Sequence, residues 1–421
     1  MPGRVLSALQ RVKARLKTQR YPRLYNVNGA DENRSSRRAL LVYKVRPFLT
    51  PPDSPWFLAH QNRRQCIQIA RVLGELGYVV DVVDIKDTKA KPTRKYAVVV
   101  SVRVELGYLD TSLTRDATKL FIATTTDHVV QKRNLLRRHE LLLKRRGRAV
   151  APGRVYTEKV PYVVEADAIA GFGNESLLET WNETSSAKKY PFNNYGFHET
   201  RFVFESKDFA NARKKFLFFA SRTQVGKGLD LLLEIFPRHP DLDLYICSRF
   251  ADEKEFCDCY QKELFQTPNI HPVGWIAVNS PEFYALINTC AFIVYPTCSD
   301  AQAGSVIQCM YAGLIPIVTR EDGLDTEDFG VTFADDSLDE IERVVVELAN
   351  LPEKWHREHS LKTRAVAEEK YSETAFIARW REILTEALPD RPAHFAEAVR
   401  KVERSASKPL DRDRLPPKPY K

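Results

Sequence analysis

Short runs of consecutive apolar residues alternate with helical patterns along most of this 421-residue chain. A strand that is apolar at every position, and not at every second one, is typical of a parallel sheet covered by helices on both faces. The alternation occurs twice, so the sequence predicts two doubly wound α/β domains, at residues 38–208 and 209–372. Strands are expected at 39–43, 78–84, 96–100, 119–124 and 166–172 in the first domain, and at 215–220, 242–247, 270–273, 291–295, 315–319 and 330–333 in the second.

A polar, charged stretch at residues 204–213 is the expected linker between the two domains. After the second domain, a further apolar pattern at residues 373–389 predicts a helix. Because the second domain is already complete at that point, we expect this helix to cross back onto the first domain. Helices inside the second domain are expected at 229–236, 252–265, 280–288, 304–312 and 337–350.

The net charge of +9 lies in the two ends of the chain, the tails at residues 1–37 and 390–421, while the body between them is slightly acidic. A nucleic-acid-binding domain usually carries its basic face on the folded body, so nucleic acid is not an expected partner. Apolar residues also recur at helical spacing among the basic residues of the first tail. This pattern fits either a helix on an anionic membrane surface or a helix docked on the body. The apolar positions are Val5, Leu9, Val12 and Leu16.

Seven cysteines lie mostly inside apolar runs without disulfide-like spacing, which favours a reducing compartment. Cys257 and Cys259 are too isolated to predict a zinc site, and no metal is expected. The N-terminus lacks the apolar region of a secretory signal, and no run reaches the ~18 apolar residues of a membrane span. We therefore expect a cytoplasmic protein, with a peripheral position at the inner membrane face as a further interpretation of the basic tail.

A glycine-bearing turn at residues 222–228 follows an expected strand and precedes an amphipathic helix. Free backbone N–H groups and the dipole at the start of a helix make such a turn an anion site. Arg222 and Lys227 add two positive charges there, and Gly226 would let a ligand approach the backbone closely. The turn is therefore expected to hold a diphosphate.

Further motifs follow this turn in order along the second domain. They are Asn269-Ile270-His271-Pro272-Val273-Gly274-Trp275, the strand end Pro296-Thr297 with Ser299-Asp300, and Ala312-Gly313-Leu314-Ile315-Pro316-Ile317-Val318. Together with the turn, they resemble the retaining glycosyltransferases of the GT-B fold, the "glycosyl transferases group 1" or glycosyltransferase family 4-like enzymes. The resemblance is looser in the first domain. It implies two Rossmann-like domains that face each other across a cleft.

The resemblance implies a role for each matching residue of the second domain. Arg222 and Lys227 would grip the diphosphate of a nucleoside-diphosphate sugar, on which charge builds as the sugar bond breaks. Residues 273–276, which include Gly274 and Trp275, would border the nucleotide base.

Family members carry two glutamates at positions where this chain has Asp300 and Gln308. Asp300 would lie near the transferred sugar, although it could instead cap the helix that follows. Gln308 would bind the ribose hydroxyls, since its amide both accepts and donates hydrogen bonds. Gly304 and Ser305 would present backbone N–H groups to the sugar or phosphate.

In the first domain, candidate residues are expected at the carboxyl ends of strands, which border the cleft in such folds. Asp127 and His128 follow one of these strands, and His128 could contact the donor sugar or phosphate. A surface histidine beside a helix start is the alternative. Two weaker candidates are His60, in a proline-rich loop, and Gly173-Asn174-Glu175, which could equally be a plain helix cap.

A basic helix is expected after His128. Its cations could face solvent, or they could bind an anionic acceptor or an anionic membrane surface. They are Lys132, Arg133, Arg137, Arg138, Lys144, Arg145 and Arg146.

The resemblance implies a hexosyltransferase-type enzyme of polysaccharide or glycoconjugate biosynthesis. It would move a sugar from a nucleoside-diphosphate sugar to a hydroxyl of a glycan, lipid or protein, with retention of configuration and without a metal or other cofactor. No D-x-D motif ends a strand, as a metal-bound donor would require.

Two alternatives come from other classes. Because Asp300 and Gln308 depart from the family pattern, the chain could be a catalytically silent GT-B-like binding or scaffold protein. It could also be another phosphate-binding enzyme, such as an epimerase of the same architecture. A dehydrogenase is disfavoured, because no G-x-G-x-x-G follows the first strand.

Overall fold

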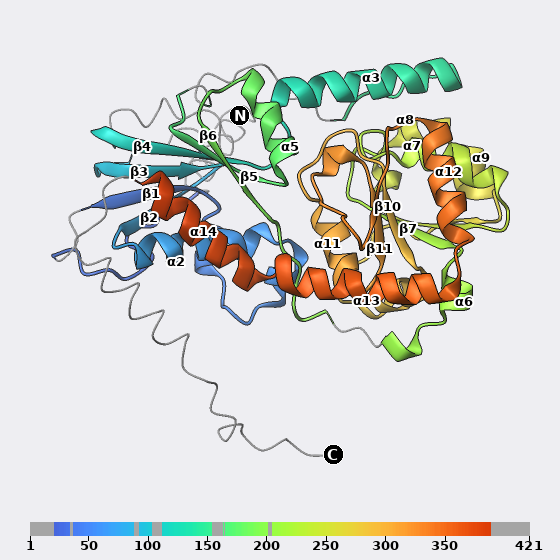
Figure 1. Cartoon of the computed structure of the whole chain (residues 1–421). Coiled ribbons are helices and arrows are strands. Elements are labelled where there is room, and N and C mark those ends of the chain that lie inside the picture. The colour runs from blue at the N-terminus through green and yellow to red at the C-terminus, as the bar shows by residue number, and fades with distance from the viewer. Residues whose placement is uncertain are drawn as a thin grey trace, which may run out of the picture.

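The structure is a computed structural model that describes residues 21–33, 37–87, 92–102, 112–153, 163, 165–200 and 204–388. Two α/β domains lie side by side in it, and a long C-terminal helical segment runs along both (Figure 1). The amphipathic pattern at residues 5–16 and the tail at residues 390–421 lie outside the described residues. Residues 21–33 are bound to the first domain through hydrogen bonds between Leu24 and Val82.

Each domain is built on a six-stranded sheet in which all the strands are parallel. The strand orders are β2-β1-β3-β4-β5-β6 and β12-β11-β10-β7-β8-β9. The first sheet comprises β1 (Arg38–Tyr43), β2 (Val79–Asp84), β3 (Tyr96–Ser101), β4 (Leu113–Ala123), β5 (Ala168–Phe172) and β6 (Lys188–Phe192), and the second β7 (Lys215–Phe219), β8 (Asp243–Cys247), β9 (Ile270–Pro272), β10 (Phe292–Tyr295), β11 (Ile315–Val318) and β12 (Val331–Thr332).

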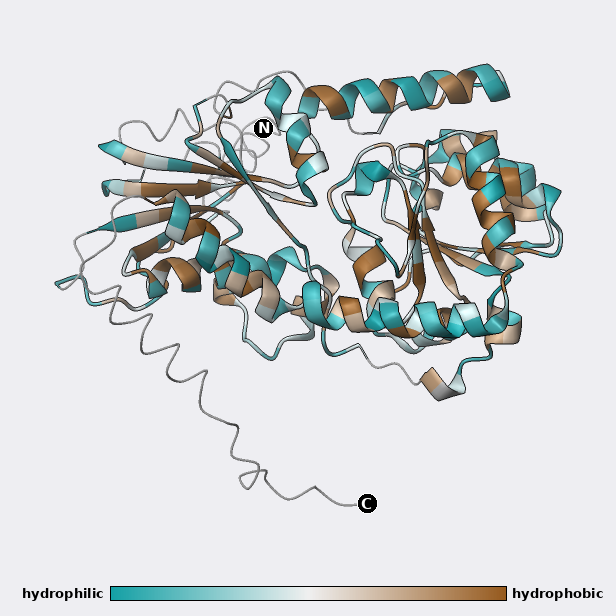
Figure 2. Cartoon of the chain, in the orientation of Figure 1, coloured by the Kyte–Doolittle hydropathy of each residue, from teal (hydrophilic) through white to brown (hydrophobic). Residues whose placement is uncertain are grey.

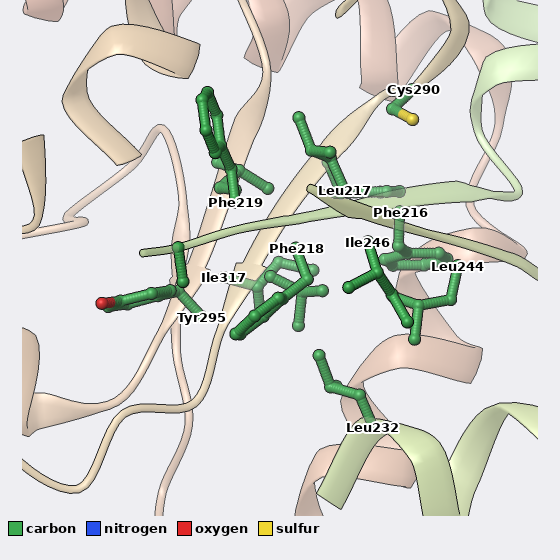
Figure 3. Packing of buried hydrophobic residues seen from close by; sticks show 14 of the residues in the cluster. Phe216, Leu217, Phe218, Phe219, Leu232, Leu244, Ile246, Cys290, Tyr295 and Ile317 are labelled. Carbon is green, nitrogen blue, oxygen red and sulfur yellow. The ribbon is translucent and has the colours of Figure 1, made fainter. Parts of the chain in front are cut away.

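Strands such as β1 and β7 are apolar along most of their length because both of their faces are buried (Figure 2). Strand β4 instead begins with a largely polar stretch that is partly exposed. Successive side chains of β7 point to opposite faces. Leu217 and Phe219 point to one face, and Phe216 and Phe218 to the other, towards Leu232 of a covering helix (Figure 3). All five side chains are buried in one cluster that forms the core of the second domain. The expectation of two doubly wound domains is confirmed.

Helices connect the strands and cover the sheets (Figure 1). They are α2 (Asn62–Glu75), α3 (His128–Arg146), α5 (Glu175–Glu179), α6 (Phe209–Ala212), α7 (Leu229–Ile235), α8 (Lys254–Cys259), α9 (Gln261–Gln266), α10 (Pro281–Thr289), α11 (Gly304–Tyr311), α12 (Leu338–Ala349), α13 (Glu353–Lys370) and α14 (Glu373–Ala387). The helix expected at 252–265 is two shorter helices, α8 and α9, which Tyr260 separates. Part of the expected linker forms α6, in which Phe209 and Ala212 are buried.

Strand β6 and helix α13 were also not expected from the sequence. Strand β6 contains Pro191, which cannot donate a hydrogen bond, but β6 is an edge strand, where proline is tolerated. Helix α13 buries polar and small side chains at helical spacing and therefore shows no apolar stripe. Its buried residues are His356, Ser360, Thr363 and Ala367.

Helix α14 crosses back onto the first domain, as expected. Its Phe376 and Trp380 are buried in the same cluster as Phe192 and Tyr195 of the first domain. The Trp380 ring meets the Phe192 ring edge to face, with centroids 5.1 Å apart. An ion pair of 2.7 Å between Arg381 and Glu75 of α2 adds a polar contact.

The strand order of the second sheet fixes where a ligand could bind. The chain begins this sheet in the middle at β7, builds outwards through β8 and β9, and then returns to the other side of β7 with β10. The loops after β7 and after β10 therefore leave the sheet in opposite directions and open a crevice at its carboxyl edge. The turn at 222–228 and the segment at 296–304 are these two loops.

Replacing Trp380 by alanine should lower the free energy of unfolding by about 3–5 kcal/mol, because it removes a large buried side chain and leaves a cavity. Urea denaturation followed by circular dichroism measures the change. Thr374→Ala, at an exposed position of the same helix, is the control and should change the free energy by less than about 0.5 kcal/mol. Equal effects of the two substitutions would contradict the packing of α14.

Candidate functional site

The two crevice loops are joined by an ion pair. Lys227, in the loop after β7, bonds through Nζ to Oδ2 of Asp300, in the loop after β10, and each side chain is 19% exposed. The same carboxylate accepts hydrogen bonds from the Tyr295 hydroxyl (2.7 Å) and the Ala301 backbone N–H (3.1 Å). Burial alone would raise the pKa of Asp300, but the charge and hydrogen bond of Lys227 and the other two donors outweigh it. The pKa therefore lies below the usual range, and the carboxylate is ionised.

Arg222 lies on the outer side of the same turn and is 64% exposed. Its guanidinium donates to Oδ2 of Asp252 from Nε (3.0 Å) and from a terminal nitrogen (2.7 Å). The two cations predicted to grip one diphosphate are therefore held by two different acids in this structure. Because the Arg222 pair is exposed and screened by water, it can exchange partners at little cost.

The backbone N–H groups of the turn are not all free, which corrects the expectation from the sequence. The Glu253 carboxylate accepts from the N–H of Thr223 and from the N–H of Gln224 (3.1 Å). An internal carboxylate thus takes the position in which an external anion was expected. Glu253 follows β8 and lies 30 residues beyond Thr223 in the chain, so no local pattern indicated that it would reach this turn.

Gly226 and Gly228 allow close packing around the turn. Gly228 has φ +84°, in the left-handed region, and the backbone carbonyl of Pro296 lies where a Cβ would project. Leu135 of α3 lies 3.0 Å from the position of a Cβ on Gly226. The space beside Gly226 is therefore filled by a side chain from the first domain.

The start of α11 contacts the first domain. Gln61 donates from Nε2 to the carbonyl of Gly304 (3.2 Å), and a Cβ on Gly304 would clash with that amide. Ser305 is partly exposed. The N–H of Ala303 donates to Oδ2 of Asp322 (3.1 Å), so one N–H at this helix start is already bound by a carboxylate.

Asp322 is a buried carboxyl that the sequence analysis did not identify. Its Oδ1 has no hydrogen-bond partner in the part of the chain that the structure describes. Burial first, and then the negative charge of Asp300, raise the pKa of Asp322 to about 7. The two carboxyls therefore differ in protonation near neutral pH. The positive charge of Lys227 strongly stabilises the ionised form of Asp300 and only weakly stabilises that of Asp322.

Gln308 lies on α11 and is fully buried. Its Oε1 accepts from the backbone N–H of Phe197 (2.9 Å), and its Nε2 bonds to the Thr200 hydroxyl. Both ends of the amide are thus engaged with the segment at residues 193–200, which connects the domains. A ribose could reach this amide only after that segment moved away.

Gly274 and Trp275 form an open rim beside the second sheet. Gly274 has φ +82°, and a Cβ there would meet no atom within 4 Å. The Trp275 ring is 47% exposed, and the Arg249 guanidinium lies 4.7 Å from its centroid. An exposed aromatic face of this kind can stack on a planar group such as a nucleotide base.

The candidates of the first domain differ in their surroundings. Asp127 is buried and caps α3, accepting from the N–H of Val129 (2.7 Å) and from the Thr184 hydroxyl. His128 is partly exposed, and its ring meets the Trp181 ring edge to face at 5.3 Å. His60 is exposed, and its Nδ1 accepts from the N–H of Asn62 (3.3 Å).

Gly173, Asn174 and Glu175 line a groove of about 790 Å³ between the domains, together with Asp325 and Lys370. Asn174 also caps α5, so the helix-cap alternative holds as well. The groove does not include Lys227, Asp300 or Arg222.

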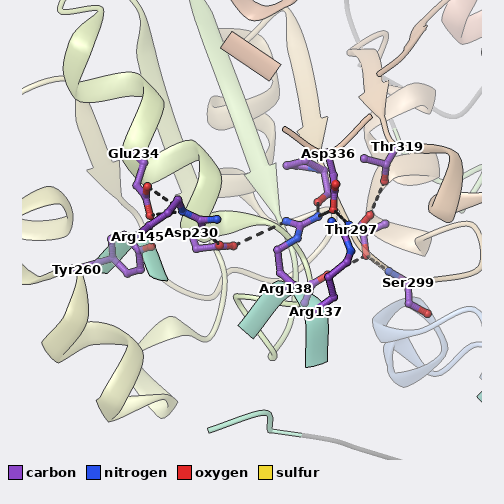
Figure 4. Close-up of polar contacts among 12 residues, drawn as sticks. Arg137, Arg138, Arg145, Asp230, Glu234, Tyr260, Thr297, Ser299, Thr319 and Asp336 are labelled. Atoms are coloured by element: carbon purple, nitrogen blue, oxygen red, sulfur yellow. Dashed lines mark hydrogen bonds and ion pairs between the residues drawn. The ribbon is translucent and has the colours of Figure 1, made fainter. Parts of the chain in front are cut away.

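The basic helix is α3, which lies beside the second domain (Figure 1), and several of its arginines contact that domain (Figure 4). Arg138 is buried and donates to Asp336 (3.0 Å) and to the carbonyl of Pro296 (3.2 Å). Arg145 bonds to Asp230 at 2.7 Å. Arg138 and Arg145 therefore neither face solvent nor bind a free anion, because they form ion pairs between the domains.

No protein-family model matches the sequence, and no curated protein matches it. Among solved structures, sucrose-phosphate synthase from Thermosynechococcus elongatus matches with a TM-score of 0.58 and 13% identity, over 83% of this chain and 99% of that one. HepE from Anabaena, in complex with UDP and glucose, matches with a TM-score of 0.51 and 10% identity, over 84% of this chain and 99% of that one. TarM matches with a TM-score of 0.47 and 13% identity, over 68% of this chain and 54% of that one.

The chain has the GT-B fold. The resemblance that the motifs predicted is thereby confirmed at the level of structure. In this GT-B chain the candidate residues of the second domain lie in the loops after β7, β9 and β10, at the carboxyl edge of the sheet, and on α11.

Two further observations concern metals and membranes. Within the described ranges, no three His, Cys, Asp or Glu side chains are grouped so that they could hold a metal ion. None of the described helices is both long enough and apolar enough to span a membrane.

The protonation of Asp322 should make stability depend on pH. The pKa of Asp322 is about 7 in the folded chain and about 3.9 in the unfolded chain. The contribution of Asp322 to the free energy of unfolding is therefore fully present below pH ~4 and is lost as the pH rises through 7. When the pH is raised from 5 to 8, the free energy of unfolding of Asp322→Asn should therefore increase relative to that of the native chain by on the order of 1–3 kcal/mol. Urea denaturation at the two pH values measures this.

Asp328→Asn is the matched control, because Asp328 is exposed and its pKa is lowered by the hydrogen bond and charge of Lys362. It should change stability equally at both pH values. If Asp322→Asn behaved like this control, the carboxyl would not hold its proton in the folded state.

Proposed function

We propose that this protein is a hexosyltransferase that moves a sugar from a nucleoside-diphosphate sugar to an acceptor hydroxyl, with retention of configuration and without a divalent metal. The observation that carries the proposal is the position of Lys227 and Asp300. They meet where the strand order of the second sheet reverses, which is where α/β sheets bind ligands. The GT-B fold supports the same conclusion.

In this proposal Lys227 stabilises the diphosphate as it leaves the sugar. A fixed ammonium group in a half-buried site stabilises developing negative charge strongly, because water screens it weakly. Asp300 holds the ammonium in place before the donor arrives, and the ionised carboxylate can then accept hydrogen bonds from sugar hydroxyls. Arg222 exchanges Asp252 for a phosphate oxygen.

The remaining candidates take supporting roles. Trp275 and Gly274 border the base, and Gly304 and Ser305 present backbone groups to the donor. Gln308 reaches the ribose only once the segment at residues 193–200 has moved. On the first domain, His128 is the side chain that we assign to the donor sugar, while Asp127 fixes the start of α3.

UDP sugars are the first donors to test, because HepE was solved with UDP and with UDP-glucose. The acceptor is a glycan, a lipid or a protein, and peripheral contact with an anionic membrane belongs to the same proposal. All seven cysteines are free thiols, six of them buried, which fits work in the reducing cytoplasm.

A second candidate function is a catalytically silent binding protein. It is favoured by two observations: Glu253 fills part of the expected anion site, and both ends of the Gln308 amide are engaged inside the protein. Such a protein would bind a nucleotide sugar without consuming it, or bind none.

Lys227→Ala and Arg222→Ala should each lower donor use by a factor of ~10²–10³, because each removes a positive charge that would stabilise the leaving group. Transfer or donor hydrolysis is measured with the donor that the native chain uses. Lys354→Ala is the control, since its side chain is 85% exposed on α13, and it should retain full activity. Unchanged donor use in both site variants would remove these residues from the donor site.

A panel of UDP, GDP and ADP sugars should separate the two functions. A ligand at 100 times its Kd adds about 2.7 kcal/mol to the stability of the folded state, which a thermal shift detects. We expect one nucleotide class to raise the Tm and to be consumed when acceptor is supplied. A shift without consumption, or no shift with any nucleotide, would favour the silent protein and contradict the hexosyltransferase.

A further inference from the structure

Gln302 has an unusual backbone conformation beside the candidate site. It lies between Asp300 and the first residue of α11, with φ +48°, and it is 1% exposed. A residue with a Cβ is disfavoured in this left-handed region, and it stays there only where its surroundings hold it. The neighbours of Gln302 must therefore supply the restraint.

The second domain supplies part of this restraint. The N–H of Gln302 donates to the carbonyl of Asp322 (2.6 Å). Its side-chain Nε2 donates to the carbonyl of Gly323 (3.1 Å). These two bonds hold one side of the residue to the loop that follows β11.

The segment between the domains supplies the rest. The N–H of Asn194 donates to Oε1 of Gln302 (2.8 Å), and Nδ2 of Asn194 donates to the Gln302 carbonyl (3.0 Å). Nε2 of Gln302 also donates to Oδ1 of Asn193 (2.8 Å). Asn194 therefore holds both the backbone and the side chain of Gln302.

Asn194 is in turn fixed to the first domain. Nε2 of Gln65, on α2, donates to Oδ1 of Asn194 (2.8 Å), and the Tyr43 hydroxyl, at the end of β1, donates to Oε1 of Gln65 (3.2 Å). All four side chains are buried. A continuous line of buried hydrogen bonds thus runs from the first sheet to the loop that carries Asp300.

We propose that Gln302 is a positioning residue that links the arrangement of the two domains in this structure to the shape of the candidate donor site. While Asn194 holds it, residues 300–304 keep the bend that sets Asp300 against Lys227 and starts α11. When the domains separate, Asn194 withdraws, and Gln302 loses two of the five hydrogen bonds described above. The catalytic consequence rests on the proposed function, whereas the link between Asn194 and the loop does not.

Hydrogen exchange of the full chain tests the link without any substrate. In Asn194→Ala, the amides of Gln302 and Ala303 should exchange at least ~10-fold faster than in the native chain, because the bend opens more often. Asn350→Ala, at an exposed helix end, is the matched control and should leave these amides unchanged. Native exchange rates at Gln302 and Ala303 in Asn194→Ala would overturn the proposal.

Kinetics test the catalytic consequence. Asn194→Ala and Gln302→Ala should each lower kcat by ~10–100-fold while changing the Kd for UDP by less than about threefold, because the loop is misplaced and no phosphate contact is lost. The two substitutions remove different hydrogen bonds of one contact, Asn194→Ala the bond from Nδ2 to the Gln302 carbonyl and Gln302→Ala the bond from the Asn194 N–H to Oε1. Because either loss releases the same loop, the double variant should be no slower than the slower single variant. Losses that multiply in the double variant would overturn the proposal.

The two tests separate the possible failures. If the native chain transfers no sugar from any donor, the proposed function fails, and hydrogen exchange still decides whether Asn194 controls the loop. If transfer occurs and both variants keep the native kcat, the positioning role fails and the proposed function stands.

Discussion

The ion pair between Lys227 and Asp300 joins the two loops that diverge in the middle of the second sheet. Both side chains are mostly withdrawn from water, so their attraction is stronger than that of a surface pair. Tyr295 and the backbone of Ala301 hold the carboxylate in place. The ammonium group of Lys227 is therefore held in a fixed position and neutralised by one carboxylate. An entering phosphate would compete only with Asp300 for this ammonium group.

The arrangement of the two domains depends on buried polar groups as well as on apolar packing. Arg138 of α3 is removed from water and pairs with Asp336 and, at 3.9 Å, with Asp230. Such a cluster costs desolvation energy and is stable only while each partner stays in place. Burial raises the pKa of Asp230 to about 6, and the two arginines beside it only partly oppose this. Together with the Asn194–Gln302 contact, the ion pairs of α3 hold the two domains in this arrangement.

Most of the fold could be predicted from the sequence, because consecutive apolar residues such as those of β7 mark strands buried on both faces. Strand β6 could not, since its proline is permitted only by its place at the edge of the sheet. At the site, residues next to the glycine turn were found through local chemistry, as Lys227 was. Glu253 and Gln302 were missed because their roles come from contacts between loops that lie far apart in the chain. The sequence pattern around Arg138 is that of an exposed basic helix, and only the packing of α3 against the second domain shows that this side chain is buried.

A crystal structure of the full chain with UDP bound would decide whether Lys227 and Asp300 form the donor site. The Lys227 ammonium should lie within hydrogen-bond distance of a phosphate oxygen, with the nucleotide in the crevice after β7 and β10. A nucleotide bound elsewhere, with the Lys227–Asp300 pair intact and no phosphate near it, would show that this pair does not bind the donor.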